Sequence, residues 1–546
     1  MDNEKEIRKI EKIIDEYYKS SSFIQRYKGN LHQALFDVLR VFERLEMASI
    51  IGSVGQEISG LKNADQFAFE QVHNLQDALN TAIQWIYKEC SHNDQKLSMG
   101  MINEDTLCVA DFILNYADPY SVIVDGFISY SRKANIGRVN GNRIIFDADD
   151  AQLKSFINDV GERLNKDQSS LESEINRIML SSEVQSSIAS FFGTIRIDNS
   201  RIDYEIPCIV YDAVYKIGEC HWKETSFLPQ EWEFEGFSLE DFKQCWLVLF
   251  ALSFIHYLAM TRVKVPGIVQ EEGVIVQSFR EFIDFLKSQT GITEERINAI
   301  VNIISYDPVL RNTDIMYQPL IRIDDQIIIT PTLITISRPE RNLISIIQKK
   351  SDSKYSIEVN NLEENMCKEL LTVLPDKTIC CIGRKLGKGY PDVDFAIFDE
   401  TTNAVLLCEM KWLIEADSTK EVFARQNDID HGCNQVETIM SIAITDPISF
   451  VKKLFGIDIQ EIPDLFWCVI SKHDIRSINP HVPVISLDTI KELLQKFSLS
   501  TVFHKIRNRE FYKPLPKNSS LGHKIVKYAG YEIWVPALVI ENEYDT

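Results

Sequence analysis

The chain has 546 residues, of which 45% are hydrophobic and 25% charged, and its formal net charge is −22. This length and composition predict an ordinary soluble globular protein with several cores, divided into three or four domains. The 11 cysteines include no Cys-x-x-Cys pair, which argues against a zinc knuckle or a disulfide framework and favours reduced thiols in the cytoplasm.

Residues 1–119 predict a helical N-terminal region. The first six residues, Met-Asp-Asn-Glu-Lys-Glu, are charged and do not read as a secretory signal. Apolar residues then recur at helical spacing, first at Ile10, Ile13 and Ile14 and again in a stripe from Leu31 to Leu45.

Residues 120–345 predict a mixed α/β region of unknown role. Strands are expected at residues 120–124 and 143–146, the second after an Asn-Gly-Asn turn that begins at Asn140, and helices follow over 150–195. Residues 200–300 are mixed and then helical. No arrangement of side chains in residues 1–345 indicates catalysis, so this part is expected to regulate, to bind a protein partner or to position a substrate.

The longest apolar run in the chain covers residues 245–260. Its 16 residues fall short of the 18 or so that a membrane-crossing helix needs, and it contains His256. It predicts a buried helix and no membrane contact. Further on, residues 320–330 read as a hairpin over Asp324 and Asp325, and the polar segment 348–354 marks a domain boundary.

An alternation of elements begins after this boundary. A helix is expected over residues 361–374 and an apolar strand over 378–383. Two more strands follow in Pro391-Asp-Val-Asp-Phe-Ala-Ile-Phe-Asp399 and Val405-Leu-Leu-Cys-Glu-Met-Lys-Trp412, with a polar turn between them. Acidic residues stand in these strands where core residues are expected.

The acidic residues of the two strands are expected to meet. Successive side chains on a strand point to opposite faces, so Asp392 and Asp394 share one face, as do Glu409 and Lys411 on the next strand. A tight turn makes the strands neighbours and brings two carboxylates and one ammonium to one edge of a sheet. Carboxylate oxygens suit Mg²⁺, a metal that polarises phosphoryl oxygens and activates water, while a lysine stabilises the developing charge.

This pattern resembles the PD-(D/E)xK nuclease superfamily, over roughly residues 355–500. Asp394 precedes the run Phe-Ala-Ile-Phe, and Glu409 and Lys411 of Glu-x-Lys begin 15 residues later. Asp392 also fits the first acid, but the apolar run starts after Asp394, which we prefer. The resemblance implies an α/β nuclease core, a mixed central sheet flanked by helices. The pattern of residues 1–345 places a large, mainly α-helical region with some β hairpins before this core.

The resemblance also implies residues outside the strand pair. A glutamate on the first helix would face the metal, and Glu363 lies within the apolar stripe whereas Glu364 lies at its edge. A helical region over 419–442, which we expect to be broken near His431 and Gly432, would place Gln435 beside the water, the lysine or the phosphate. Glu363, Asp394 and Glu409 would hold one or two Mg²⁺ ions, with Mn²⁺ as substitute.

Basic residues identify two surfaces for phosphate contact. Residues 351–546 hold 22 Lys and Arg against 29 Asp and Glu, whereas the stretch 504–527 has seven against one. The residues 501–546 predict a basic loop and a C-terminal hairpin, and the candidate contacts there are Lys505, Arg507, Arg509 and Lys513. Lys385 and Lys388 lie in a Gly-rich loop that opens onto the Asp394 strand.

The function expected from the sequence is a cytoplasmic, metal-dependent endonuclease. DNA is the expected substrate because most of the superfamily cuts DNA, and a bacterial restriction or antiphage defence role is expected by analogy. A homodimer, or a protein partner bound through residues 1–345, would fit a single site that cuts one strand. The alternative is a catalytically inactive nucleic-acid-binding, scaffold or signalling protein whose function lies in residues 1–345, since acids near strand ends also occur without catalysis.

Overall fold

The computed structural model describes residues 2–58, 64–91, 104–148, 169–198, 201–263, 273–310, 313–350, 353–375, 378–416, 418–473, 475, 479, 481–511 and 519–540. The chain forms two compact units. The first unit consists of Met1–Val124, Asp167–Tyr355 and Val526–Ile533, and the second of Asp125–Lys166, Ser356–Ile525 and Trp534–Thr546.

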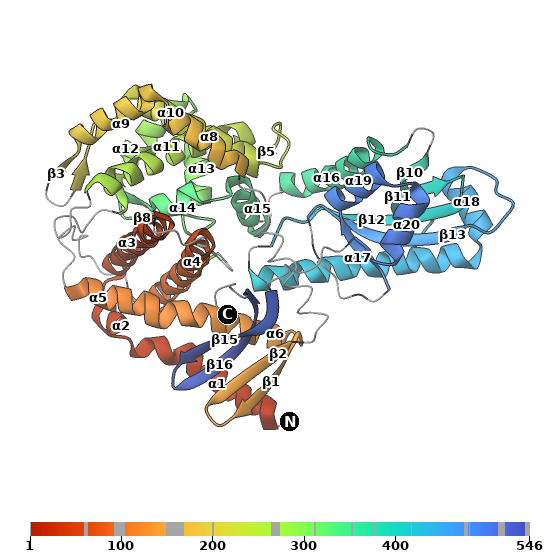
Figure 1. Cartoon of the computed structure of the whole chain (residues 1–546), viewed down its shortest axis with the longest axis horizontal. Coiled ribbons are helices and arrows are strands. Elements are labelled where there is room, and N and C mark those ends of the chain that lie inside the picture. The colour runs from red at the N-terminus through yellow and green to blue at the C-terminus, as the bar shows by residue number, and fades with distance from the viewer. Residues whose placement is uncertain are drawn as a thin grey trace. The chain divides into compact units, whose positions relative to one another are not determined.

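The first unit is mainly helical (Figure 1). Its helices are α1 (Asp2–Tyr17), η1 (Tyr18–Ser20), α2 (Ser22–Tyr27), α3 (Leu31–Ile58), α4 (Ala64–Glu89), α5 (Glu104–Asp111), the π-helical turn η2 (Phe112–Ala117), α8 (Ser169–Met179), α9 (Ser182–Thr194), α10 (Cys208–Thr225), α11 (Leu239–Val263), α12 (Phe279–Thr290), α13 (Glu294–Ile304), α14 (Pro331–Thr335) and α15 (Pro339–Lys349). Its strands are β3 (Arg196–Asp198), β4 (Arg201–Asp203), β5 (Glu233–Phe234), β6 (Phe237–Ser238), β7 (Ile275–Ser278), β8 (Leu320–Ile323) and β9 (Gln326–Ile329).

Helix α11 is the apolar centre of one part of the first unit. It contains the predicted run 245–260, and side chains on several faces, among them Cys245, Leu249 and Ile255, are buried. A helix that is apolar on most faces must be enclosed by protein, and α10 and α14 pack against α11. By length and apolarity, 239–261 and 107–131 are the two described helical stretches that reach the range of membrane-crossing helices, and 67% of the apolar window of the first is buried in the protein.

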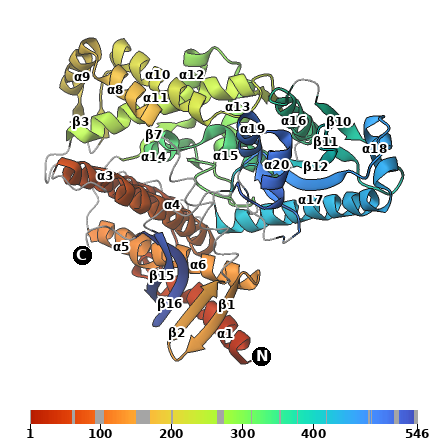
Figure 2. The same cartoon turned by 45° about the vertical axis from the view of Figure 1, so that its right-hand side comes forward.

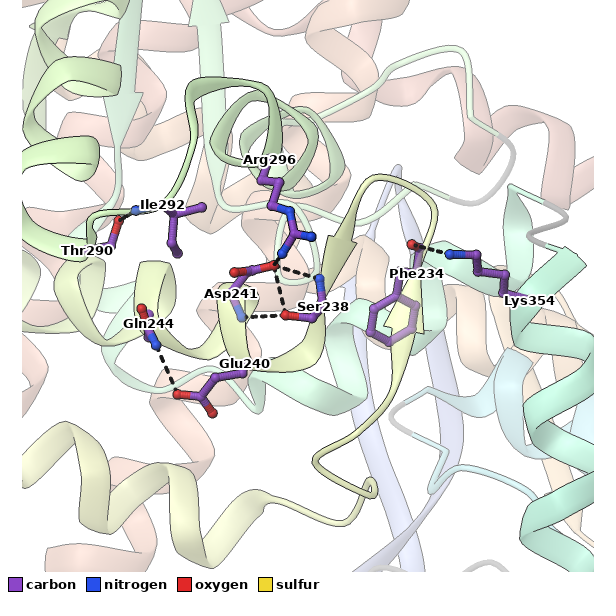
Figure 3. Close-up of polar contacts among 9 residues, drawn as sticks. All are labelled: Phe234, Ser238, Glu240, Asp241, Gln244, Thr290, Ile292, Arg296 and Lys354. Atoms are coloured by element: carbon purple, nitrogen blue, oxygen red, sulfur yellow. Dashed lines mark hydrogen bonds and ion pairs between the residues drawn. The ribbon is translucent and has the colours of Figure 1, made fainter.

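The start of α11 is tied to α13 by one carboxylate. Asp241 accepts hydrogen bonds from the backbone N–H of Ser238 at 2.9 Å and from its hydroxyl at 2.8 Å, and Nη1 of Arg296 donates to the same oxygen at 2.6 Å (Figure 3). A carboxylate in the first turn of a helix also meets the positive end of the helix dipole. The first unit therefore fixes the N-terminal end of its most apolar helix by polar contacts.

Two buried carboxyl groups lie one turn apart on α3. Glu43 accepts from the backbone N–H of Thr332 at 2.7 Å and from its hydroxyl at 2.6 Å. Glu46 is 0% exposed, and neither of its oxygens has a hydrogen-bond partner in the described part of the chain. Burial raises the pKa of Glu43 to about 8, and burial followed by the neighbouring Glu43 raises that of Glu46 to about 9. Glu46 is therefore held as a neutral acid at pH 7.

The second unit contains helices on both sides of a larger sheet. Its elements are β1 (Asn135–Asn140), β2 (Arg143–Ala148), α16 (Ser353–Leu371), β10 (Ile379–Arg384), β11 (Val393–Asp399), β12 (Ala404–Lys411), α17 (Thr419–Thr445), α18 (Pro447–Phe455), β13 (Asp464–Ser471), β14 (Val484–Ser486), α19 (Leu487–Lys496) and α20 (Leu499–Arg507), with α16 beginning at the end of the first unit. Helix α6 (Asp118–Ser131) and strands β15 (Ser519–Tyr528) and β16 (Tyr531–Ile540) each have residues in both units.

The five-stranded sheet has the order β10-β11-β12-β13-β14. Strands β10, β11 and β12 are antiparallel neighbours, whereas β12, β13 and β14 run parallel. The sheet is therefore mixed, and the parallel half requires the crossover that α17 and α18 provide. A separate four-stranded sheet has the order β1-β2-β16-β15.

Helices cover both faces of the five-stranded sheet (Figures 1 and 2). On one face Ala396, Phe398 and Leu407 pack with side chains of α17 and α18, and on the same side Val469 and Val484 pack with Ile429, Cys433 and Val436 of α17. On the other face α20 packs on β13 through Phe503 and Phe466. Because strands β11 to β13 are buried on both faces, they carry nearly continuous apolar runs.

The structure confirms several predicted elements and corrects others, of which one lies in the first half of the chain. The strand at 143–146, the hairpin at 320–329, the buried helix at 245–260 and the succession of helix, three strands and helix from α16 to α17 are present. The strand expected at 120–124 is wrong, because these residues lie inside helix α6. Pro119 lies just after the π-helical turn η2, an irregularity of the kind that accommodates proline inside a continuous helical stretch, and burial of Ile123 overrides the β propensity of the run.

Replacing Glu46 by glutamine should change how stability depends on pH. The native state keeps a proton on Glu46 that the unfolded chain releases above pH 4.5, so the free energy of unfolding falls by about 1.4 kcal/mol per pH unit between pH 5 and pH 8 for this group. Glu46→Gln removes that slope. Urea unfolding at pH 5, 6.5 and 8 measures it, with Glu219→Gln on the exposed side of α10 as control. Equal slopes in wild type and Glu46→Gln would contradict the assignment.

Candidate active site

The acids of β11 and β12 lie next to each other on one face of the sheet. Ala396 pairs with Leu407 in the antiparallel register of the two strands. Asp394 is two residues before Ala396, and Glu409 is two residues after Leu407, so both carboxyl groups share the face that α17 covers. The pairing ends at Phe395 and Cys408, which places the acids where the strands separate.

Asp394 is held by the backbone of the neighbouring strand. Its Oδ2 accepts a hydrogen bond from the backbone N–H of Met410 at 2.9 Å, and its carboxyl group also shares a hydrogen bond with that of Glu409. Burial raises the pKa of Asp394, although the Met410 N–H and the Lys411 ammonium counteract it. The alternative first acid, Asp392, is exposed. The structure therefore brings Asp394, and not Asp392, to the Glu-x-Lys strand.

Glu409 is the most buried charged group of the arrangement. It is 1% exposed, and Nζ of Lys411 donates to its Oε1 at 2.7 Å. Its Oε2 has no hydrogen-bond partner in the described part of the chain. Burial, and next the carboxylate of Asp394, raise the pKa of Glu409 to about 7. One buried carboxyl oxygen is thus left without a donor beside a second carboxyl group.

Lys411 is held as an ammonium ion. Burial lowers the pKa of Lys411, but the carboxylates of Glu409, Glu363 and Asp394 outweigh that effect, and the pKa lies above its usual value. The side chain is largely buried between these acids. In this arrangement Lys411 can donate hydrogen bonds and stabilise negative charge, whereas it cannot accept a proton from water.

Helix α16 contributes Glu363. Its Oε1 accepts a hydrogen bond from the backbone N–H of Trp412, just after β12, at 3.2 Å. Burial is the main cause that raises the pKa of Glu363. Glu364, the alternative, is 56% exposed and pairs with Lys368 at 3.0 Å. Of the two candidates, Glu363 is the one that reaches the acids of the sheet.

Helix α17 passes over the same group of residues. It runs unbroken from Thr419 to Thr445, so the break expected near His431 and Gly432 is wrong. Gly432 is buried against Lys411 and Glu409, which explains a glycine inside the helix by close packing. On the same helix Oε1 of Gln435 is buried and has no hydrogen-bond partner among the described residues.

The donor set fits a hard divalent cation in part. Glu409 Oε2 and Gln435 Oε1 are buried oxygens without donors, and oxygen ligands suit Mg²⁺ or Mn²⁺. In the described ranges, however, no three His, Cys, Asp or Glu side chains are close enough together to enclose a metal ion. Asp394 and Glu409 lie close together, whereas Oε1 of Glu363 already accepts a hydrogen bond from the backbone N–H of Trp412.

The basic residues divide into exposed and internally bound groups. Lys385 and Lys388 are exposed on the loop between β10 and β11. The guanidinium of Arg507 stacks on Phe466 at 3.7 Å and donates to the Leu465 carbonyl at 3.0 Å. Of the other candidates near the C-terminus, Lys505 contacts Glu510 and Phe497, and Arg509 donates to the carbonyl of Asn479.

Two of these basic residues do not lie in the predicted loop. Lys505 and Arg507 belong to helix α20, so the basic stretch begins as a helix. Lys513 lies outside the described residues. Phosphate contact by Lys505, Arg507 and Arg509 would require them to leave the protein groups that they now contact, which makes Lys385 and Lys388 the better placed pair.

Sequence reasoning did not identify the contribution of Gly432. The signal was present, because glycine inside a long helical segment costs helix stability and needs a reason. The expected reason was a break in the helix, whereas the structure gives a close approach to Lys411. Nothing in the local sequence states which side chain a helical glycine faces.

Divalent cations should stabilise the second unit through Asp394 and Glu409. At a free Mg²⁺ or Mn²⁺ concentration about 100 times the dissociation constant, the native state gains about 2.7 kcal/mol. The shift in melting temperature should be larger at pH 8 than at pH 6, because a carboxyl group with a pKa of about 7 must lose its proton to bind metal. Asp394→Ala should abolish the shift and Glu364→Ala should retain it. An undiminished shift in Asp394→Ala would exclude this site.

Comparisons with models of known protein families, with curated proteins and with solved structures found no match to this chain. The chemistry of the second unit is therefore inferred from its own side chains, above all Asp394, Glu409 and Lys411.

Proposed function

We propose that the second unit is a metal-dependent nuclease that hydrolyses phosphodiester bonds, with DNA as the expected substrate. One observation carries the proposal. Asp394, Glu409 and Lys411 meet at the point where two central strands separate, and one oxygen of the buried Glu409 lacks a donor. The order of elements around them also suits the resemblance to the PD-(D/E)xK superfamily.

A purely structural role accounts poorly for this arrangement. Two carboxyl groups that share a hydrogen bond in a buried position repel each other when both are ionised, and a single ammonium balances only part of that charge. Apolar residues at the same positions would often be as stable or more stable. Buried acids of this kind, with perturbed pKa values, are more typical of sites that bind a cation or react.

The proposed roles follow from the position of each side chain. Asp394 and Glu409 would hold Mg²⁺ or Mn²⁺, and Glu363 would support them from α16. The bound metal would polarise a phosphoryl oxygen and generate hydroxide at neutral pH. Lys411 would orient the attacking water and stabilise the charge that develops on the phosphorus-bound oxygens. Gln435 would accept a hydrogen bond from that water through its buried Oε1.

Cleavage of plasmid and single-stranded DNA in Mg²⁺ or Mn²⁺ tests the proposal. Lys411→Ala should lower the rate at least 100-fold, since an interaction with the developing charge is lost. Lys368→Ala, which removes an exposed lysine of α16, is the matched control and should cut as wild type does. For the carboxylates, Glu363→Ala should lower the rate and Glu364→Ala should not.

Two results would reject the proposal. Cleavage that persists in both Lys411→Ala and Asp394→Ala would assign the activity elsewhere. If wild type neither cuts nor binds Mn²⁺ by calorimetry, the unit is a catalytically inactive domain, and the function lies in residues 1–345.

Lys385 and Lys388 are proposed to contact the phosphate backbone near the site. Replacing both by alanine should weaken DNA binding without loss of stability, because both side chains are exposed. The slope of log affinity against log salt should become shallower by up to about 2. Arg507→Ala is the contrasting variant and should lower the melting temperature, because its guanidinium packs on Phe466. Fluorescence anisotropy with labelled DNA in Ca²⁺ measures binding, and an unchanged slope would reject the contact.

A further inference from the structure

Gly432 lies at the closest approach of α17 to the proposed site. A Cβ atom at this position would lie 3.0 Å from Cε and 3.4 Å from Cγ of Lys411, and 3.5 Å from Cγ of Glu409. The first distance is shorter than ordinary van der Waals contact and the other two are at its near edge, so a methyl group here requires Lys411 or the helix to shift by a few tenths of an ångström.

The helix itself does not require this glycine. Gly432 is inside the 27 residues of α17, where glycine is the least favourable residue after proline because it loses the most backbone freedom. Its φ is not among the positive values of the chain, so alanine could adopt the same backbone conformation. The reason for glycine is therefore outside the helix, in its contact with Lys411.

The helix cannot easily move to make room. Ile429, Cys433 and Val436 flank Gly432 on α17 and are buried against Val469 and Val484 of the sheet. A shift of α17 away from β12 would open these contacts, whereas rotation about the side-chain bonds of Lys411 leaves the packing of the helix intact and changes only the position of the ammonium. An added methyl group at 432 should therefore be accommodated by Lys411.

We propose that Gly432 is a positioning residue that fixes the side chain of Lys411 by leaving no free space beside it. The stem of Lys411 is confined by the surface of α17 at Gly432, and its ammonium is thereby held on Oε1 of Glu409 at 2.7 Å. The importance of that position for cleavage depends on the function proposed above. The contact between residues 411 and 432 does not.

A double-mutant cycle on stability tests the contact without reference to activity. Gly432→Ala is made in two backgrounds, Lys411→Met and Lys411→Ala, both of which lack the ammonium. The methionine keeps atoms near the positions of Cγ and Cε, whereas the alanine removes them. In the alanine background Gly432→Ala should raise the melting temperature by roughly 2 °C or more through helix propensity. In the methionine background this gain should be lost.

Kinetics of the full-length protein then test the consequence. Gly432→Ala alone should lower kcat about tenfold at nearly unchanged KM, because the ammonium moves relative to the reacting group while the binding surface stays. Its melting temperature should stay within a few degrees of wild type. Asn434→Ala, an exposed position on the same helix, is the control for helix propensity and should leave kcat unchanged.

The outcomes separate the two proposals. Equal effects of Gly432→Ala in the methionine and alanine backgrounds would overturn the positioning role, whether or not the protein cuts DNA. A difference between the backgrounds, with neither cleavage nor Mn²⁺ binding by wild type, would retain the contact and reject the nuclease. Cleavage with an unchanged kcat in Gly432→Ala would leave the nuclease and overturn the role of Gly432.

Discussion

The central constraint in the second unit is Glu409, a buried carboxyl group with one oxygen that has no hydrogen-bond partner among the described residues. Glu409 is enclosed by two strands and a helix, receives one hydrogen bond from Lys411 and shares another with Asp394. In a low-dielectric environment each of these interactions is strong, and so is the penalty for the oxygen that has no donor. Lys411, α17 at Gly432 and Asp394 near the start of β11 all lie against this group.

Other buried carboxylates of the same chain show what a structural solution looks like. Glu340 accepts two backbone N–H groups, from Phe227 at 2.6 Å and Leu228 at 2.8 Å. Glu43 is satisfied in the same way by Thr332. Each of these groups closes a loop or the start of a short helix with both bonds made inside the protein. Glu409 differs because its neighbours are a second carboxyl group and an ammonium. These groups ionise, whereas the backbone N–H groups of Phe227 and Thr332 are neutral donors. Glu46 differs from both, since no cation is among the causes that shift its pKa.

The sequence predicted those parts of the fold that depend on local pattern. The apolar runs in 393–399 and 404–411, the apolar stripe of α16 and the run at 245–260 each indicate their secondary structure through their length and spacing. The position of Asp394 beside Glu409 followed from the tight turn alone. The prediction of a strand at residues 120–124 was wrong, because a β-branched run becomes helical when tertiary packing favours a helix.

What the sequence could not give was the partner of each side chain. From the sequence, Lys385 and Arg507 are both candidates for phosphate contact. In the structure Lys385 is exposed, whereas the guanidinium of Arg507 stacks on Phe466 and donates to the Leu465 carbonyl. Likewise Glu363 and Glu364 are adjacent, but the direction of α16 sends one to Trp412 and the other to Lys368. These choices depend on how helices are placed on the sheet, which is a long-range property.

The same long-range placement determines how an acidic protein could approach a polyanion. With a net charge of −22, the chain as a whole repels nucleic acid at long range. Among the described basic residues near the C-terminus, Arg507 and Arg509 donate to carbonyl oxygens of their own chain, so these N–H groups are not available to phosphate oxygens. The remaining attraction would come from the exposed Lys385 and Lys388 and from cations held by Asp394 and Glu409. Attraction of that kind acts only over short distances, at ordinary ionic strength within about 10 Å. Recognition would therefore depend on the site itself, and a bound metal would contribute to substrate binding as well as to chemistry.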